Sequence, residues 1–136
     1  MNRNTLRYIL PLLFVAVLLT ACGERKVAVT EDAAEIKFDT LSHDFGTIPP
    51  DTRVSYDFVF HNIGSTYLHL EDIKPTCSCT AAKYPKGGIE PGETAAITIT
   101  YDSHGSSPGH FSRSIRVYSN AKTSFLRLNV SGEVGE

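Results

Sequence analysis

The sequence lacks the residue patterns that support most classes of enzyme. It contains no phosphate-binding glycine loop, no His-Glu-x-x-His zinc motif and no pattern of paired carboxylates. Its one Gly-x-Ser-x-Gly stretch, residues 105–109, lies in a loop rich in glycine, serine and proline, and no helical pattern follows it as a nucleophile elbow requires. It also lacks a run of basic residues, and the formal net charge of the 136-residue chain is −2. These absences give a hydrolase or transferase no support, and they argue against a nucleic-acid partner. We expect a protein that is not an enzyme.

A hydrophobic segment long enough to span a membrane is absent as well. The apolar run from Tyr8 to Ala21 has about fourteen residues, whereas a membrane-spanning helix needs roughly twenty. Arg3 and Arg7 precede this run, and no acidic residue accompanies them. A short basic segment followed by a short apolar one is typical of an export signal. The sequence therefore predicts a signal peptide over residues 1–21 that is cleaved from the mature chain.

Cysteine is scarce, and the first of the three cysteines follows the apolar run directly. The stretch Leu18-Leu19-Thr20-Ala21-Cys22 resembles a lipobox, the signal in which diacylglycerol is attached to the cysteine thiol. The alternative is an ordinary secretory signal with an incidental cysteine. The resemblance implies lipidation at Cys22 and a lipid bilayer as a partner, because two or more acyl chains anchor a protein stably. The expected location is the cell envelope, with the outer membrane favoured because Gly23 is not the aspartate that retains some lipoproteins at the inner membrane.

Removal of the signal peptide would leave a small, mildly acidic chain. Of the 136 residues, 115 remain, with 11 of the 13 basic side chains and all 15 acidic ones, for a net charge of −4. Residues 22–34 combine charged and small side chains without a sustained apolar period, so they are predicted to be a flexible tether that begins at the lipidated cysteine. Residues 35–136 are long enough to bury one core without metal or disulfide support.

Short alternating segments, broken by turn residues about every eight to twelve positions, run through this domain and are typical of β-sandwiches and barrels. The expected strands cover residues 35–39, 42–45, 53–61, 67–74, 80–84, 94–101, 111–119 and 126–130, the first two of which could be one broken strand. The predicted core contains Val54, Tyr56, Phe58, Phe60, Leu68, Leu70, Ile97, Ile99, Tyr101, Ile115, Val117, Leu126, Leu128 and Val130. We expect an all-β fold, a two-sheet antiparallel sandwich of about seven strands, with a small barrel as the alternative.

Five motifs together resemble the DUF1573 family of bacterial envelope proteins. They are Ser42-His43-Asp44-Phe45-Gly46-Thr47-Ile48, Phe58-Val59-Phe60-His61-Asn62-Ile63-Gly64, Thr76-Cys77-Ser78-Cys79-Thr80, Pro91-Gly92-Glu93 and Gly132-Glu133-Val134. The resemblance covers residues from about 36 to 134. It implies an immunoglobulin-like domain related to those of the hydin and ASPM type, in a family whose function is not established. It implies a binding or scaffolding role and supplies no reaction.

The chain departs from the family at its cysteine motif. Family members usually carry Ser-Cys-Gly-Cys-Thr, whereas this chain has Thr76 in place of the serine and Ser78 in place of the glycine. A glycine that adopts a positive φ would be replaced by serine only with strain. The conformation expected of this turn therefore depends on the φ of Ser78.

The pair Cys77 and Cys79 allows several kinds of chemistry. In an extended segment their Cα atoms would lie about 6.6–7 Å apart, at the limit for a disulfide, so a bridge requires a local turn and would be readily reduced. The two thiolates could instead bind Cu(I) or Zn(II), if a further ligand came from one of the five histidines, His43, His61, His69, His104 and His110. Inert packing and redox catalysis are the remaining alternatives.

The other polar candidates have ordinary structural explanations. The histidines at 61, 69, 104 and 110 are expected at the solvated surface, and His43-Asp44 is expected to bond backbone donors at a strand end. Tyr67, Tyr84 and Tyr118 are expected to point outward and to suit an interface. The sequence thus predicts a membrane-tethered, non-enzymatic module that binds an envelope protein through a sheet edge or the loops at one end. The alternative function is copper or zinc handling by Cys77 and Cys79.

Overall fold

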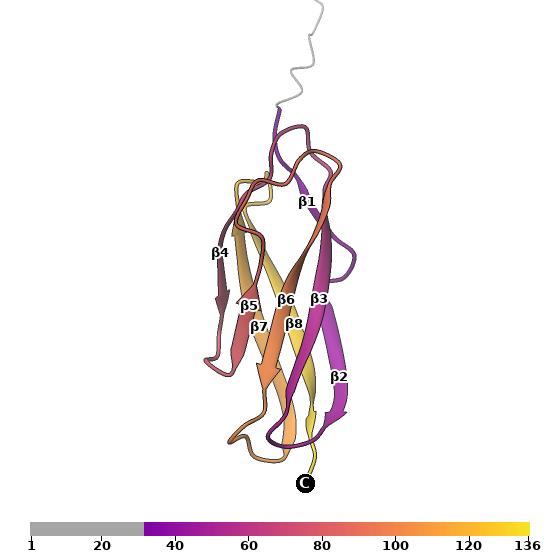
Figure 1. Ribbon diagram of the computed structural model, residues 1–136, viewed down its shortest axis with the longest axis vertical. Coiled ribbons are helices and arrows are strands. Elements are labelled where there is room, and N and C mark those ends of the chain that lie inside the picture. The colour runs from indigo at the N-terminus through magenta and orange to yellow at the C-terminus, as the bar shows by residue number, and fades with distance from the viewer. Residues whose placement is uncertain (1–31) are drawn as a thin grey trace, which may run out of the picture. The chain divides into compact units, whose positions relative to one another are not determined.

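A computed structural model describes residues 32–136, in which eight strands form an all-β domain (Figure 1). The strands are β1 (Ile36–Phe38), β2 (Ser42–Ile48), β3 (Arg53–Asn62), β4 (Leu70–Pro75), β5 (Thr80–Lys83), β6 (Thr94–Asp102), β7 (Gly109–Ser119) and β8 (Phe125–Val134). In this part of the chain no helix is long and apolar enough to span a bilayer. The predicted signal peptide, the lipidation site at Cys22 and the tether up to residue 31 lie outside the described residues.

The strands form two four-stranded sheets that face each other, in the orders β1-β3-β6-β5 and β2-β8-β7-β4 (Figure 1). The predicted sandwich is therefore confirmed, and a single closed barrel is not formed. The orders match the ABED and CFG sheets of a constant-type immunoglobulin domain, with the first strand divided between both sheets. This division explains why eight strands are present where the sequence indicated about seven.

The strand β2 makes the one parallel pairing in the described sheets, with β8. Its register shifts between Asp44 and Thr47, and Gly46 in this bulge has a φ of 67°, a conformation that favours glycine. The Asp44 carboxylate accepts a hydrogen bond from the Gly46 backbone N–H at 2.8 Å. Asp44 therefore stabilises the bulge, which agrees with the structural role expected of it at a strand end.

The core fills the space between the sheets, because alternate side chains of each strand point inward. Phe58, Phe60, Ile97 and Ile99 are fully buried, as the alternation predicts. Leu68, Leu70, Ile115, Val117, Leu128 and Val130 extend the same cluster. Tyr56 and Leu126 are only half-buried and pack against the margins of this cluster, and the half-buried Val54 packs against a different one. A second, smaller cluster of Ile48, Tyr101, Phe111 and Val134 lies at one end of the sandwich.

The folded domain begins before Ile36. The side chain of Ala34 is 2% exposed and belongs to the main core, and the Ala33 carbonyl accepts a hydrogen bond from Ser65 N–H. Residues 32–34 are predicted to be part of the tether, because their side chains are charged or small. They belong to the domain instead, because the segment pairs with the loop after β3, a contact that composition does not reveal.

The two ends of the sandwich carry different loops. Residues 32–35, the loop after β3 and the β7–β8 turn lie at one end, which we call the entry end (Figure 1). The β2–β3 turn (49–52), the β4–β5 turn (76–79) and the β6–β7 loop (103–108) lie toward the other, which we call the cysteine end. Cys77, Cys79 and the smaller core cluster are at the cysteine end.

Candidate functional site

Cys77 and Cys79 occupy the turn between β4 and β5 and are joined by a disulfide, with their Cα atoms 5.2 Å apart. The local turn that such a bridge requires is present, since Thr80 N–H donates to the Cys77 carbonyl at 3.1 Å. Thr76 N–H donates to the Ser114 carbonyl at 3.0 Å and fixes the turn to β7. Both cysteines are partly exposed. The disulfide is thus held on the rigid sheets and remains open to solvent.

The serine that replaces the family's glycine causes no backbone strain in this turn. Among residues 32–136, Asp51 is the only non-glycine residue with a positive φ, so Ser78 has an ordinary backbone conformation. Its side chain is exposed. The departure at Ser78 is therefore compatible with the turn observed.

Arg113 is the residue near the disulfide that sequence reasoning missed. Inward-facing residues alternate along β7, and Phe111, Ile115 and Val117 are all buried. Arg113 lies in the same alternation and is half-buried, with its Nε donating to Cys79 Sγ at 3.2 Å. The sequence did contain a signal for Arg113, because a charged residue at an inward position of a strand needs a polar partner. What that partner is could not be read from the alternation.

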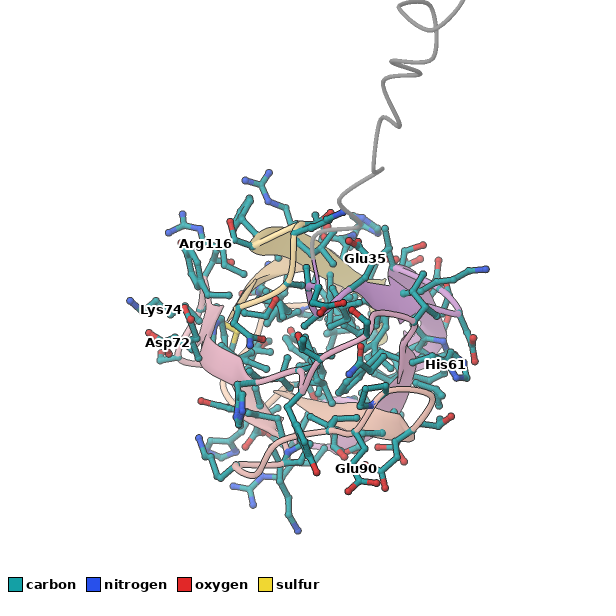
Figure 2. The ribbon with its side chains drawn as sticks, turned by 90° about the horizontal axis from the view of Figure 1, so that it is seen from above. Glu35, His61, Asp72, Lys74, Glu90 and Arg116 are labelled. Atoms are coloured by element: carbon teal, nitrogen blue, oxygen red, sulfur yellow. A yellow bond between two sulfur atoms is a disulfide. The ribbon has the colours of Figure 1, made fainter. Side chains whose placement is uncertain are left out.

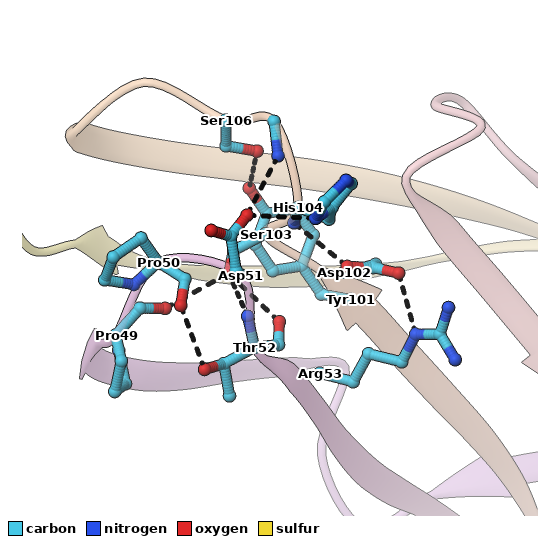
Figure 3. A network of polar contacts seen from close by, with 11 residues as sticks. Pro49, Pro50, Asp51, Thr52, Arg53, Tyr101, Asp102, Ser103, His104 and Ser106 are labelled. Atoms are coloured by element: carbon cyan, nitrogen blue, oxygen red, sulfur yellow. Dashed lines mark hydrogen bonds and ion pairs between the residues drawn. The ribbon is translucent and has the colours of Figure 1, made fainter.

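A shallow hollow of about 320 Å³ adjoins Cys79 and is lined by Arg53, Ser78, Cys79, Ala81, Thr100 and Asp102. Arg53 Nε donates to the Asp102 carboxylate at 2.7 Å. This hydrogen bond is the main reason why the pKa of Asp102 lies below its ordinary value and the pKa of Arg53 above its own. Figure 3 shows that the network continues from Asp102 to His104 and Asp51, whose side chains are 3.0 Å apart. The ion pair of Arg53 and Asp102 therefore lies in the hollow beside Cys79.

The five histidines are dispersed over the domain. His43 stacks on Tyr56, with ring centroids 3.7 Å apart, and is half-buried between the sheets rather than free in solvent. His69, His104 and His110 are exposed, as expected. Within residues 32–136 no group of three or more His, Cys, Asp or Glu side chains is placed to hold a metal ion. The predicted copper or zinc site thus has no third ligand in the part of the chain described.

His61 takes part in an arrangement that resembles a catalytic triad in composition only. Its Nε2 lies 2.8 Å from Asp39 Oδ1 and its Nδ1 lies 2.9 Å from Thr94 Oγ1. The three side chains are on the solvent-facing side of β3 and its neighbours, and Asp39 and Thr94 are exposed (Figure 2 labels His61). These groups are open to water and not enclosed in a pocket, so their hydrogen bonds stabilise the surface of the sheet and do not form a catalytic site.

The three tyrosines proposed for an interface have different surroundings. Tyr67 is 52% exposed and its hydroxyl donates to Glu90 at 2.9 Å, which raises the pKa of Tyr67. Tyr84 is partly buried against the main core, so its predicted outward position is wrong. It follows β5 directly and continues the inward-facing side of that strand, in phase with Thr80 and Ala82. Tyr118 points outward on β7 and pairs with Phe125, with ring centroids 5.3 Å apart.

A row of three cations crosses the outer face of the second sheet beside these rings. Lys74 on β4 lies opposite Arg116 on β7, which lies opposite Arg127 on β8, and all three side chains are exposed. Tyr118 and Phe125 form the adjacent register pair. We call these five residues the cation–aromatic face. Figure 2 shows Lys74 and Arg116 projecting away from the sandwich.

The cations of this face are incompletely neutralised. Lys74 contacts Asp72 at 2.9 Å, which raises the pKa of Lys74 and lowers that of Asp72. Within residues 32–136, Arg116 and Arg127 lie within 4.0 Å of no carboxylate. Like charges directly opposite one another destabilise a sheet, so the row costs stability in the isolated domain. No run of basic residues marks it in the sequence, because the strands bring together cations 42 and 11 positions apart.

The described domain matches a known family over nearly its whole length. A family model described as "Protein of unknown function (DUF1573)" matches residues 36–134. The chain belongs to the DUF1573 family. The match spans all eight strands of the domain. A search of curated proteins finds no match.

Solved structures similar to this DUF1573 domain share its fold at low sequence identity. A protein of unknown function from Porphyromonas gingivalis W83 superposes with a TM-score of 0.66 at 16% identity, over 81% of this chain and 51% of that one. This chain thus spans about half the length of that protein. The ASH/PapD-like domain 7 of human CEP192 gives 0.61 at 17% identity, over 82% of this chain and 92% of that domain. The Vibrio cholerae VesB protease superposes with a TM-score of 0.58 at 12% identity, over 75% of this chain and 32% of that one. These likenesses show an immunoglobulin-like fold for the DUF1573 domain.

Proposed function

We propose that this chain is a membrane-tethered, non-enzymatic binding module of the bacterial cell envelope, and that its cation–aromatic face holds an acidic segment of a partner protein. The observation that carries the proposal is the row Lys74, Arg116 and Arg127 beside two aromatic rings. Arginine and aromatic residues are enriched in protein interfaces, and guanidinium groups bind carboxylates with two parallel hydrogen bonds. A carboxylate-bearing partner would relieve the repulsion within the row.

The positive charge of the row indicates that the partner's segment is acidic. The domain is acidic overall, so a local cationic row on it gives an approaching acidic segment an orientation as well as an attraction. The rings of Tyr118 and Phe125 supply apolar area, with Lys74 Nζ 5.7 Å from one ring centroid and Arg127 Cζ 6.0 Å from the other. The interface proposed here is a sheet face, in place of the sheet edge or end loops that the sequence suggested.

The membrane tether supports this role by confining the domain to a surface. Diacylation at Cys22 would hold the chain at the bilayer, and binding to another envelope protein would then be favoured by proximity. The lipid itself is a second possible ligand of the cations, since each basic side chain near an anionic bilayer contributes about 1 kcal/mol. We favour the protein because two aromatic rings lie in register beside the row.

The test compares charge reversals on the two sheets of the full chain in intact envelopes. A photo-crosslinking residue replaces the exposed Ser112, which lies on the same outer side of β7 as Arg116, and the Arg116→Glu, Arg127→Glu double variant is compared with a Lys37→Glu, Lys83→Glu control on the other sheet. We expect the first variant to lower the yield of crosslinked protein at least tenfold and the control to leave it unchanged. Equal yields would refute the proposal.

A second measurement separates protein from lipid. Purified full chain is titrated with a glutamate-rich peptide and, separately, with vesicles containing an anionic phospholipid. Peptide binding that weakens with salt and requires Arg116 and Arg127 supports the proposed function. Vesicle binding that requires the two arginines, without any peptide binding, would show that the face contacts the membrane and would overturn it.

A further inference from the structure

The Cys77–Cys79 disulfide has a cation held against one of its two sulfur atoms. Arg113 Nε donates a hydrogen bond to Cys79 Sγ at 3.2 Å. Among the described residues, the hydrogen bond to Cys77 Sγ comes from the uncharged backbone N–H of Cys79. The guanidinium is fixed from two other sides, by donation from Nη1 to the Ser112 carbonyl at 2.9 Å and by the Tyr101 ring, whose centroid is 5.7 Å from Cζ. The two sulfur atoms are therefore electrostatically unequal.

The position of Arg113 makes this contact more than an incidental surface hydrogen bond. The side chain enters the sandwich on the inward face of β7, among positions that are otherwise apolar or small. No carboxylate within residues 32–136 lies within 4.0 Å of its nitrogen atoms. A half-buried cation without an acidic partner stabilises negative charge that develops beside it. The atom placed to develop that charge is Cys79 Sγ.

We propose that Cys77–Cys79 is a thiol-reactive disulfide, attacked at Cys77 by the thiolate of a peptide or protein, with Cys79 as the leaving thiolate stabilised by Arg113. In this step the incoming R–S⁻ forms a bond to Cys77 Sγ. The Cys77–Cys79 S–S bond breaks, and its electron pair leaves on Cys79 Sγ. The product is a mixed disulfide R–S–S–Cys77, and no oxidant other than the disulfide itself is needed.

A second thiolate completes the exchange. It attacks the sulfur of R in the mixed disulfide, so that Cys77 leaves as a thiolate. Two external thiols are then joined as a disulfide, while Cys77 and Cys79 have gained two electrons and take up the two protons released. The rate of such exchange depends on how well the leaving sulfur bears negative charge, and a neighbouring cation improves it. The polar hollow beside Cys79 gives water access to the departing thiolate.

Access and rigidity favour the first step. The turn is part of the solvent-exposed cysteine end, and both cysteines are partly exposed. Cys79 packs against the smaller core cluster, and its backbone carbonyl accepts a hydrogen bond from Asp102 N–H at 2.9 Å. Cys79 is therefore the anchored sulfur of the pair, which suits a leaving group that stays beside Arg113. This reactivity does not depend on the cation–aromatic face or on the proposed partner.

The test treats the full chain, extracted in detergent, with glutathione as the thiol probe and quenches mixed disulfides by alkylation. Peptide mass spectrometry then reports which cysteine carries glutathione. We expect no alkylation of Cys77 or Cys79 before the thiol is added, and adducts on Cys77 in clear excess afterwards. Free thiols at the start, an excess of adducts on Cys79, or no reaction at millimolar glutathione would each overturn the proposal.

Variants isolate the contribution of Arg113. Arg113→Gln should slow opening of the disulfide about fivefold and abolish the preference for Cys77. Arg113→Lys should keep part of the rate and of the preference, because it keeps the charge but not the separate Nε and Nη1 donors. Lys122→Gln, which removes an exposed cation at the entry end, is the matched control and should react as the wild type does. If Arg113→Gln keeps the wild-type rate and the wild-type adduct position, the proposed role of Arg113 is wrong. The preference in the wild type tests the proposal even where the glutamine variant does not fold.

Discussion

Gly64 is the position at which one added methyl group should detach the first residues of the domain. A Cβ at this position would lie within 3.0 Å of three backbone atoms, Ala33 O, Glu35 N and Ala34 C. Backbone atoms cannot rotate away as a side chain can, so the segment 33–35 must move. We therefore expect Gly64→Ala to separate this segment from the loop after β3.

The magnitude follows from what that segment contributes. Two hydrogen bonds flank Gly64, from Ile63 N–H to the Glu35 carbonyl and from Ser65 N–H to the Ala33 carbonyl, each 2.9 Å long. Each contributes about 0.5–1.5 kcal/mol to stability. Exposure of the buried Ala34 side chain adds roughly 1 kcal/mol. We expect a loss of about 2–4 kcal/mol, which for a domain of this size lowers Tm by roughly 10–25 °C.

Urea denaturation of the chain beginning at Asp32 measures this loss, and Gly87→Ala is the matched control. A Cβ at Gly87 meets nothing within 4 Å, so the control should stay within about ±0.5 kcal/mol of the wild type. Hydrogen exchange adds a local test, because the amides of Ile63 and Ser65 should lose protection in Gly64→Ala. If both variants are equally stable, or if these two amides stay protected, the reasoning about Gly64 is refuted.

Three further predictions concern the core, the anchor and an ion pair. Phe58→Ala should cost about 3–5 kcal/mol in urea denaturation, because the ring is fully buried, and Asp57→Ala on the exposed face should cost far less; similar losses would contradict the inward assignment. Cys22→Ser should abolish acylation, and mass spectrometry of the mature N-terminus decides this, since an unmodified terminus at another residue would contradict lipidation. Arg53→Met should raise the pKa of Asp102 toward its ordinary value, as followed by carboxyl NMR titration, because the hydrogen bond from Arg53 is the main cause of its lowering. Because the pKa of Asp102 is lowered in the folded state, its carboxylate stabilises the protein at pH values above the ordinary pKa of an aspartate. This stabilisation is lost as the pH falls through the lowered pKa, so the stability of Arg53→Met should change less with pH below about 4.

Much of the domain could be predicted from local sequence. Alternation of apolar and polar residues with period two, as from Arg53 to His61, identifies a strand and its buried face without any partner. Proline and glycine in the turns identified where most strands end, so the predicted strands agree with β3, β5, β6 and β7 to within two residues. The motifs around Gly46, Gly64 and Gly132 indicated the family, and close backbone contacts at two of these glycines give the physical reason.

Pairing between distant segments could not be predicted in this way. The break after Phe38 sends β1 to one sheet and β2 to the other, and the parallel pairing of β2 with β8 depends on how the whole sandwich closes. Tyr84 packs against the core because it continues the inward side of β5, in phase with Thr80 and Ala82, and the pairing of this short strand with β6 decides which of its sides faces inward. Local alternation carries no information about which strands become neighbours, since that choice depends on the sum of all contacts.

The candidate sites show the same division between sequence and tertiary structure. The sequence alone determined the strands with their buried faces, the pair Cys77 and Cys79, and an export signal pattern ending at Cys22. Only the tertiary structure brought Arg113 to Cys79 across 34 positions and aligned Lys74, Arg116 and Arg127 across three strands. The physical reason is that a charge acts over a few ångströms in space, whereas the register that sets those distances is decided by burial of the apolar faces of both sheets.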